Sequence, residues 1–400
     1  MPCHRWPLLL RSLGAGLVFF AVGCQDATAP SGPVDPALPA LATAAALKFR
    51  QIDIGIDHAC GTTTDSLAYC WGSGTVGELG TGTRIAVQST PIAVEGGRRW
   101  RHVTTGAAFS CGVTSDLKAW CWGNNLHGEL GDGTTTDRIH MVQVAGGHKF
   151  RQIRAGANHA CALDTNNVAW CWGWNNFGQV GDGTIAHRRP SPVKVAGSHT
   201  FVELSGRTHH TCGRTPAGKA WCWGRNESGA LGDGTKMNRN VPTAVLGGLT
   251  FSQLNAGGLH TCGVTTGHKA YCWGLNLDGE LGDGTTDTLL TPHAVAGGQS
   301  FASVSAGANF TCGVNLSGQG FCWGRNMNGQ LGVGVFSGTH LLPEPVSGGR
   351  TWTFVRAGDT TTCGVTTDHR GLCWGENNVG QLGNGTQSQS AVPVAIAAPS

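Results

Sequence analysis

The sequence lacks the charge pattern of a nucleic-acid-binding protein and the periodicity of a helical one. Only 13% of its 400 residues are charged, and 27 Lys and Arg residues nearly balance 24 Asp and Glu residues. The basic residues are scattered and form no Lys/Arg stripe, so we expect no nucleic-acid partner. No stretch shows convincing helical periodicity. The sequence therefore indicates neither a helical fold nor a nucleic-acid-binding surface.

A catalytic constellation is missing as well. No nucleophile stands beside a base, and we find neither paired carboxylates nor a cluster of metal-ligating side chains. We therefore predict no catalytic residue, no cofactor and no bound metal. An exported enzyme is kept only as an alternative interpretation.

The N-terminal segment contains only a short apolar run. The run Leu13–Gly23 has fewer than the roughly 20 apolar residues that a membrane-spanning helix needs. It follows Arg5 and Arg11, and a positive start before a short apolar run is typical of an export signal. We therefore expect the chain to leave the cytoplasm.

The segment Ala21–Cys24 resembles the lipobox of bacterial lipoproteins, whose cysteine is lipidated, although Ala21 replaces the usual leucine. The resemblance implies a lipoprotein signal peptide over residues 1–23 and a lipid anchor at Cys24. Gln25 after the cysteine favours the outer membrane, facing the periplasm or the cell surface. The alternative is ordinary signal cleavage and secretion.

Residues 24–47 are rich in Pro and Ala and poor in large apolar residues. Such a segment buries too little surface to fold alone, and we interpret it as a tether. We predict the folded domain over residues 48–397.

The remaining chain is a sevenfold repeat with a period of 50 or 51 residues. Because a catalytic site is usually singular, a feature repeated seven times indicates framework. The first cysteine of each unit marks the period: Cys60, Cys111, Cys161, Cys212, Cys262, Cys312 and Cys363.

Each unit reads as four short strands. In the third unit, alternating or closing strand patterns cover Phe150–Gly156, His159–Asp164, Val168–Gly173 and Ser191–Gly197. Four strands in about fifty residues, repeated seven times, predict an all-β fold: a seven-bladed β-propeller with four-stranded antiparallel blades. A β-helix is the alternative, but its repeats are much shorter.

Fourteen cysteines form seven pairs with a spacing of ten positions. Cys161 and Cys171 lie equally far from the predicted turn Asp164–Asn167, so they should face each other with Cα atoms about 4.5–5.5 Å apart. This distance suits a disulfide. Zinc ligation and free thiols are the alternatives, but seven separate blades cannot easily pool four zinc ligands. We predict the same bridge in the other units, at Cys60–Cys70, Cys111–Cys121, Cys212–Cys222, Cys262–Cys272, Cys312–Cys322 and Cys363–Cys373.

Aromatic residues flank the second cysteine of each pair. Trp170 and Trp172 share the strand face opposite Cys171, and we expect this face to pack on the sulfur-bearing face of a neighbouring blade. Stacking on carbohydrate is the alternative. The residues equivalent to Trp172 are Trp71, Trp122, Trp223, Trp273, Trp323 and Trp374.

Two other repeated positions are interpreted as structural. An aspartate between glycines should hydrogen-bond its own backbone two residues on, and one carboxylate per loop is too few for calcium. A histidine recurs two positions before the first cysteine, in a slot that also accepts Phe or Thr, so we expect it to be packed and hydrogen-bonded. The aspartates are Asp132, Asp182, Asp233 and Asp283, and the histidines are His58, His159, His210 and His260.

The segments Gly257–Val264 and Tyr271–Thr285 contain, in this order, a Gly followed by His-Thr, a hairpin, "WG", an Asn and "GELGDG". In this they resemble the regulator of chromosome condensation repeat family. The resemblance covers all seven units and implies a seven-bladed propeller. The cysteine pairs are similar to those of an exported bacterial branch of the family. Family membership alone would imply guanine-nucleotide exchange, which has no evident substrate outside the cytoplasm, so we assign function from the residues instead.

The loops after each "WG" differ between units and carry aromatic, apolar and Arg side chains. If these loops share one face, they form a surface with the chemistry of protein-binding hot spots. We therefore predict a protein-interaction module, inhibitory or scaffolding, with an unidentified protein partner and a membrane anchor at Cys24; a carbohydrate-binding propeller is the alternative. The candidate partner-binding residues are Leu126, His127, Trp174, Phe177, Arg225, Leu275, Leu277, Arg325 and Met327.

Overall fold

A computed structural model describes residues 46–400 of the chain. The predicted signal peptide, the lipidation site Cys24 and nearly all of the predicted tether lie outside the described residues. Within residues 46–400 no helix is long and apolar enough to cross a membrane.

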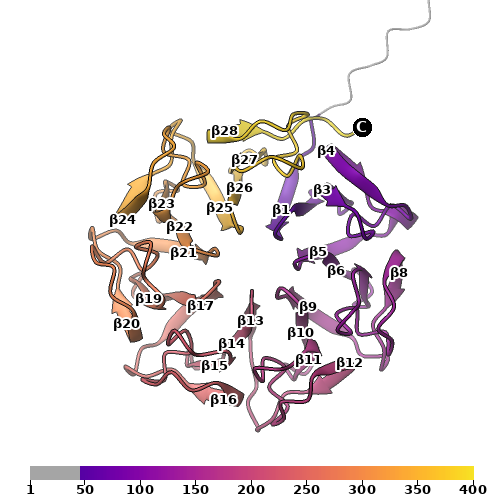
Figure 1. The fold of residues 1–400 in the computed structure, drawn as a ribbon, viewed down its shortest axis with the longest axis horizontal. Coiled ribbons are helices and arrows are strands. Elements are labelled where there is room, and N and C mark those ends of the chain that lie inside the picture. Colours follow the sequence, from indigo (N-terminus) through magenta and orange to yellow (C-terminus); the bar gives the residue numbers. More distant parts are fainter. Residues whose placement is uncertain (1–45) are drawn as a thin grey trace, which may run out of the picture. The chain divides into compact units, whose positions relative to one another are not determined.

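The described residues form seven four-stranded antiparallel sheets arranged in a ring (Figure 1). Each sheet is one blade, and its strands follow one another in chain order from the centre of the ring to the outside. The predicted all-β, seven-bladed propeller with four-stranded blades is therefore confirmed. A single 3-10 turn, η1 (Glu95–Gly97), follows the first blade.

Blade 1 comprises β1 (Phe49–Ile54), β2 (His58–Thr63), β3 (Ala68–Gly74) and β4 (Ile85–Ala93). Blade 2 comprises β5 (Trp100–Thr105), β6 (Phe109–Thr114), β7 (Ala119–Gly123) and β8 (Arg138–Gln143). Blade 3 comprises β9 (Phe150–Ala155), β10 (His159–Asp164), β11 (Ala169–Trp174) and β12 (Arg188–Lys194). Blades 4 and 5 comprise β13 (Glu203–Gly206), β14 (His210–Arg214), β15 (Ala220–Gly224) and β16 (Arg239–Ala244); and β17 (Phe251–Ala256), β18 (His260–Thr265), β19 (Ala270–Gly274) and β20 (Leu289–Ala294). Blades 6 and 7 comprise β21 (Phe301–Ala306), β22 (Phe310–Asn315), β23 (Gly320–Arg325) and β24 (Thr339–Pro345); and β25 (Trp352–Ala357), β26 (Thr361–Thr366), β27 (Gly371–Gly375) and β28 (Ser390–Ala395).

The fourth strand of the blade differs from the sequence prediction. In the third blade it begins at Arg188 and ends at Lys194, three residues earlier at each end than the predicted strand Ser191–Gly197. The structure pairs Arg188 with Trp174, so the strand starts as soon as the loop can bring it alongside β11. Pro190 and Pro192 interrupt the alternating sequence pattern, so the sequence prediction placed the start of the strand too late. Both prolines are tolerated because β12 is an edge strand.

The two cysteines of each blade oppose one another across the central hairpin. Cys161 pairs with Cys171 in the register of β10 and β11, and a disulfide joins them. Across the seven blades the paired Cα atoms are 4.0–4.1 Å apart, slightly closer than the 4.5 Å lower bound expected from strand pairing alone, because the covalent bridge draws the strands together.

The hydrophobic core lies between blades. Each of its seven clusters combines the disulfide of one blade with the tryptophan of the next, as Cys111 and Cys121 of blade 2 do with Trp172 of blade 3. The same combination recurs in all clusters, so the predicted packing of rings on sulfur is confirmed. A blade alone therefore leaves half of a core uncovered, and the ring is the stable unit.

The ring closes without exchanging strands between its ends. Blade 1 consists only of N-terminal strands and blade 7 only of C-terminal ones. The amide of Phe49 donates to the carbonyl oxygen of His369, 2.8 Å away, as the amide of Trp100 does to Ser66 between blades 1 and 2. The closing interface therefore repeats the contacts made by blades that are consecutive in the chain.

Candidate functional site

Two loops of each blade open together on one face of the ring. The loop that joins the first and second strands is tied to the residue after "WG" by a backbone hydrogen bond, for example from the amide of Trp174 to the carbonyl oxygen of Asn158, 2.8 Å away. The amide of Arg225 makes the same bond to His209 at 2.9 Å. Because all seven sheets repeat one strand order around the ring, these paired loops form a single surface, which we call the loop face.

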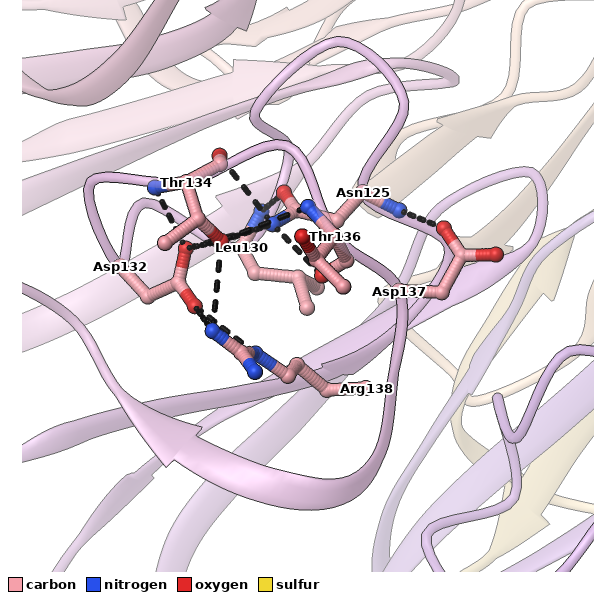
Figure 2. Close-up of polar contacts among 7 residues, drawn as sticks. All are labelled: Asn125, Leu130, Asp132, Thr134, Thr136, Asp137 and Arg138. Carbon is pink, nitrogen blue, oxygen red and sulfur yellow. Dashed lines mark hydrogen bonds and ion pairs between the residues drawn. The ribbon is translucent and has the colours of Figure 1, made fainter.

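A buried asparagine holds the longer loop in shape, as Figure 2 shows for Asn125. Its side-chain oxygen accepts from the Leu130 amide at 3.0 Å, and its side-chain nitrogen donates to the carbonyl oxygens of Thr134 and Thr136 at 3.2 and 3.1 Å. One side chain thus joins three parts of the loop. The loop residues between these anchors are held in place on the loop face.

The glycine-flanked aspartate of this loop is structural. Asp132 accepts from the amide of Thr134, two residues on, at 2.9 Å, and pairs with Arg138 at 2.8 Å (Figure 2). Burial alone would raise the pKa of Asp132, but the hydrogen bonds from Thr134 and the Arg138 guanidinium together hold it below its usual range. The same two-residue bond occurs at Asp182, Asp233 and Asp283, as predicted.

Side chains from blades 2, 3 and 4 gather into one cluster on the loop face. The Trp174 ring centroid lies 5.0 Å from His209, 5.4 Å from Phe177 and 5.7 Å from His127. Further contacts join His127 to His187, and the Arg225 guanidinium to the face of Phe177 at 5.1 Å. We call this cluster the aromatic patch; it consists of His127, Trp174, Phe177, His187, His209 and Arg225.

The patch combines ring faces with unused polar atoms. The Nδ1 atoms of His127 and His209 and the indole Nε1 of Trp174 are buried without a hydrogen-bond partner among the described residues. Burial, together with the Arg225 guanidinium, lowers the pKa of His209 to about 4, and burial also lowers that of His127. Both rings are therefore neutral near pH 7. The patch offers apolar ring faces and, at Arg225, a guanidinium that is ion-paired with Glu227 at 2.6 Å.

The other sequence candidates do not join this cluster. Leu126, Leu277 and Met327 are 59%, 69% and 57% exposed, and Arg325 is exposed as well. Leu275 is half-buried on blade 5. Leu275 and Leu277 lie on blade 5 and Arg325 and Met327 on blade 6, outside the three blades that form the patch, whereas Leu126 precedes His127 in the blade 2 loop. They are separate apolar or charged points on the loop face.

Sequence reasoning missed two members of the patch. His209 lies in the loop before the buried histidine slot, where the other blades have Asp57, Ala108, Asn158, Leu259, Asn309 and Thr360. His187 lies just before β12. A comparison of the short first loops across the repeats would have singled out His209 as an aromatic neighbour for Trp174; no comparable signal marks His187.

The repeated tryptophans and histidines are part of the framework. Trp172 and its six equivalents are fully buried, which excludes them from stacking on carbohydrate. His159 is buried and its Nε2 lies 2.9 Å from the Thr211 hydroxyl of the next blade; burial lowers its pKa to about 3. In the part of the chain that the structure describes, no group of three or more His, Cys, Asp or Glu side chains is arranged to hold a metal ion.

Comparisons with known proteins identify the repeat. A family model described as the RCC1-like domain matches residues 18–312, and a model of the regulator of chromosome condensation (RCC1) repeat matches residues 317–365 and 368–400.

Named relatives match in part. Human E3 ubiquitin-protein ligase HERC2 is 36% identical over 88 residues, which are 22% of this chain and 2% of HERC2. The ultraviolet-B receptor UVR8 of Arabidopsis thaliana is 29% identical over 197 residues, which are 48% of this chain and 45% of UVR8. The chain therefore spans less than half the length of these relatives. The structure of yeast RCC1 (Prp20) with Kap60 bound has a TM-score of 0.72 at 19% identity, covering 93% of this chain and 91% of that one, which shows a shared fold.

Proposed function

Because this chain belongs to the RCC1-like repeat family, we propose that it is a protein-interaction propeller that binds its partner through the aromatic patch. The observation that carries the proposal is the gathering of six side chains from three adjacent blades on one face, with Trp174 at their centre. A well-packed cluster of aromatic and Arg side chains is the usual chemistry of a binding hot spot.

The patch is suited to a protein ligand for two reasons. Trp174 and Phe177 are half-buried, so their contacts hold them in place before a partner arrives and little side-chain entropy is lost on binding. The ring faces of Trp174 and Phe177 can pack against apolar groups of the partner, and Arg225, ion-paired with Glu227 at 2.6 Å, adds a polar contact beside Phe177. Yeast RCC1, of the same family and fold, has been crystallised with the protein Kap60, which supports a protein partner for this propeller.

The test is affinity capture and titration with the double variant Trp174→Ala/Phe177→Ala. We expect the variant to lose a partner that wild type retains, with affinity reduced at least tenfold when the purified partner is titrated. The matched control is Leu277→Ala/Met327→Ala, which removes two exposed apolar side chains from the same face but outside the patch. Equal binding by the patch variant, or equal losses in both variants, contradicts the proposal.

We also propose that the chain is a member of an exported, disulfide-containing bacterial branch of the family, anchored at Cys24. Seven disulfides support export, because cytosolic reductants would keep these thiols reduced. The lipobox-like segment Ala21–Cys24 supports the anchor.

Mass spectrometry of the N-terminus after expression in a bacterium with an outer membrane tests this. The expected product begins at Cys24, carries acyl chains and fractionates with the outer membrane, whereas Cys24→Ala abolishes acylation and releases the protein from the membrane. A chain with an intact N-terminus in the cytosol contradicts export. A cleaved but unacylated wild-type product contradicts the anchor only.

A further inference from the structure

A cavity lies in the centre of the ring, where the inner strands of all seven blades meet. Its volume is about 70 Å³, and residues of the loops after these strands, such as Gly106 and Thr208, belong to its lining. A second cavity of about 130 Å³ is lined by residues of blades 3 to 7. Arg154 and Arg356 line both cavities, so two guanidinium groups stand between them. Both cavities lie in the central channel and the first one opens toward the loop face.

One slot on the inner strand explains why these arginines are unusual. The slot follows the buried aliphatic residue of each inner strand and is filled, from blade 1 to blade 7, by Asp53, Thr104, Arg154, Ser205, Asn255, Ser305 and Arg356. The five short side chains share a structural role, because each accepts a hydrogen bond from a backbone amide of the next blade: Thr105, Ala155, Ala256, Ala306 and Ala357 are the donors. A guanidinium has no acceptor atom, so Arg154 and Arg356 cannot make this bond. The framework therefore does not account for them.

A third arginine also breaks the repeat. Arg207 stands where the other six blades have Gly55, Gly106, Gly156, Gly257, Gly307 and Gly358. A Cβ atom at Gly106 would overlap the ring of Phe109, and at Gly156 the ring of His159. In blade 4 the glycine lies one position earlier, as Gly206, and Arg207 fills the slot. The Arg207 side chain then reaches from blade 4 to blade 7, where its Nη1 donates to the carbonyl oxygen of Ala357 at 3.0 Å.

The three guanidinium groups are short of partners. Among residues 46–400, no carboxylate lies within ion-pair distance of any of them, and the Nε atoms of Arg207 and Arg356 are buried without a hydrogen bond. Burial lowers the pKa of Arg154, and the nearby Arg356 charge lowers it further. Burying a cation without a partner is costly, and an unsatisfied buried donor calls for a ligand or an ion.

The carboxylates of the channel offset this charge only in part. The first cavity is lined by Asp53 and Asp359 against three arginines. Two carboxylates against three guanidinium groups leave one excess positive charge, and Asp53 also accepts from the Thr104 hydroxyl at 2.7 Å. In the second cavity Glu203 is paired with Arg214 at 3.0 Å. The channel therefore carries excess positive charge, and the N–H donors of its guanidinium groups are directed at a confined space.

We propose that the central channel binds a small oxyanion between the guanidinium groups of Arg154, Arg207 and Arg356. Guanidinium N–H groups match the oxygen spacing of phosphate, sulfate and carboxylate groups, often in pairs. Both cavities have room for an ion of this size. A bound dianion would bridge Arg154 and Arg356, offset their mutual repulsion and join blade 3 to blade 7 through the centre of the ring. This site is independent of the aromatic patch.

Calorimetric titration of the full chain with phosphate, sulfate or malonate, each at constant ionic strength set with chloride, tests the site. We expect binding that chloride does not reproduce, a rise in Tm, and at least a tenfold loss of affinity in Arg154→Gln/Arg356→Gln. The matched control is Arg350→Gln, which removes an exposed arginine and should bind as wild type does. A preference for malonate over the inorganic ions identifies a carboxylate ligand, and the reverse order identifies phosphate or sulfate. Equal affinities in wild type and the double variant, or a response to chloride alone, overturn the proposal.

A second measurement uses the wild-type protein alone, so it does not depend on whether a variant folds. Crystals of wild-type protein soaked in selenate should show an anomalous peak within hydrogen-bond distance of Arg154 and Arg356. A channel without this peak, at selenate concentrations that saturate the calorimetric response, also overturns the proposal.

Discussion

The indole N–H of Trp71 donates a hydrogen bond to the backbone carbonyl oxygen of Gln381, 2.9 Å away, although 310 positions separate the two residues in the chain. The same bond crosses every other blade interface: Trp122 to Glu78, Trp172 to Glu129, Trp223 to Gln179, Trp273 to Ala230, Trp323 to Glu280 and Trp374 to Gln330. The chain ends are thus joined by the contact that joins neighbouring blades, but without a covalent connection.

This bond predicts that Trp71→Phe destabilises the ring more than the same change at an interface where a hydroxyl also donates to the carbonyl oxygen. Gln381 accepts from Trp71 alone among the described side chains, because blade 1 has Ala59 where five other blades have a hydroxyl; only blade 3, with Ala160, shares this feature. The variant therefore leaves a buried carbonyl oxygen without a partner, which costs about 1–3 kcal/mol. Denaturant unfolding measures the loss, and hydrogen exchange should rise in β1 and β26.

Trp223→Phe is the matched control. It makes the same change in ring size, but the Gln179 carbonyl oxygen keeps the hydroxyl of Thr211 as a donor at 3.0 Å. We expect this variant to lose about 1 kcal/mol less than Trp71→Phe. If the two variants unfold at the same denaturant concentration, the unpaired carbonyl does not set the stability of the closing interface.

Much of the fold was predictable because the same pattern of strands, turns and cysteines is repeated seven times in the sequence. The period fixed the number of blades, and alternation within a unit located β10 without error and β9 and β11 to within one residue. The equal distance of Cys161 and Cys171 from the turn gave their pairing. The fourth strand was placed wrongly because Pro190 and Pro192 interrupt the alternating pattern, and only an edge position permits them there.

The candidate site was predictable only in part. Large rings in an Asn/Gly loop drew attention to Trp174 and Phe177, but which neighbours they meet depends on the rotation between blades, which no single repeat encodes. His209 entered from blade 4 for this reason. Arg154 and Arg356 look like ordinary polar residues of alternating strands, and their significance depends on seven strands converging on one axis.

Glu129→Gln should stabilise the protein at neutral and alkaline pH. Burial raises the pKa of Glu129 to about 7, above its ordinary value of 4.5. The favourable, protonated form is fully present below pH 4.5, and its contribution is lost as the pH rises through 7. Ionisation then costs about 3 kcal/mol at most, which the amide avoids. Unfolding free energies of wild type and variant from pH 4 to 8 should diverge steadily and level off above pH 7.

A glutamine already occupies the position equivalent to Glu129 in another blade of this chain. Gln179 fills the same slot in blade 3, and its side-chain oxygen accepts from the Phe177 amide at 3.0 Å, as Glu129 does from the His127 amide at 2.8 Å. The framework bond should therefore survive the change. A variant whose advantage over wild type is the same at pH 4 and at pH 8 would show that ionisation of Glu129 is not the cause.

His159→Phe should reduce the sensitivity of the protein to acid. Burial lowers the pKa of His159 to about 3, below its ordinary value of 6.5, and the nearby His209 and His210 lower it further. Stability from the neutral ring is present above pH 6.5 and is lost as the pH falls toward 3, about 2 kcal/mol by pH 5. Unfolding free energies at pH 7 and pH 5 should differ less in the variant by this amount.

Phenylalanine already fills this slot in blades 2 and 6, as Phe109 and Phe310. Thr211 loses the imidazole but keeps the Gln179 carbonyl oxygen as an acceptor, as Thr362 beside Phe310 keeps that of Gln330. The comparison variant is His199→Phe, which changes a histidine outside this slot. An equal reduction of acid sensitivity in both variants would mean that burial of His159 does not cause it.

The disulfides should brace the interfaces between blades as well as their own hairpins. Each closes a loop of about ten residues, for which the chain-entropy model gives about 3 kcal/mol. Cys161 and Cys171 also pack against Trp223 of the next blade, so Cys161→Ala/Cys171→Ala removes sulfur from that interface too. We expect the loss in unfolding free energy to exceed about 3 kcal/mol, and to fall by about 0.5 kcal/mol or more when Trp223→Phe is already present, because two changes at one contact are not additive whereas the loop-closure contribution is unchanged. Additive losses would show that the bridge acts within its hairpin alone.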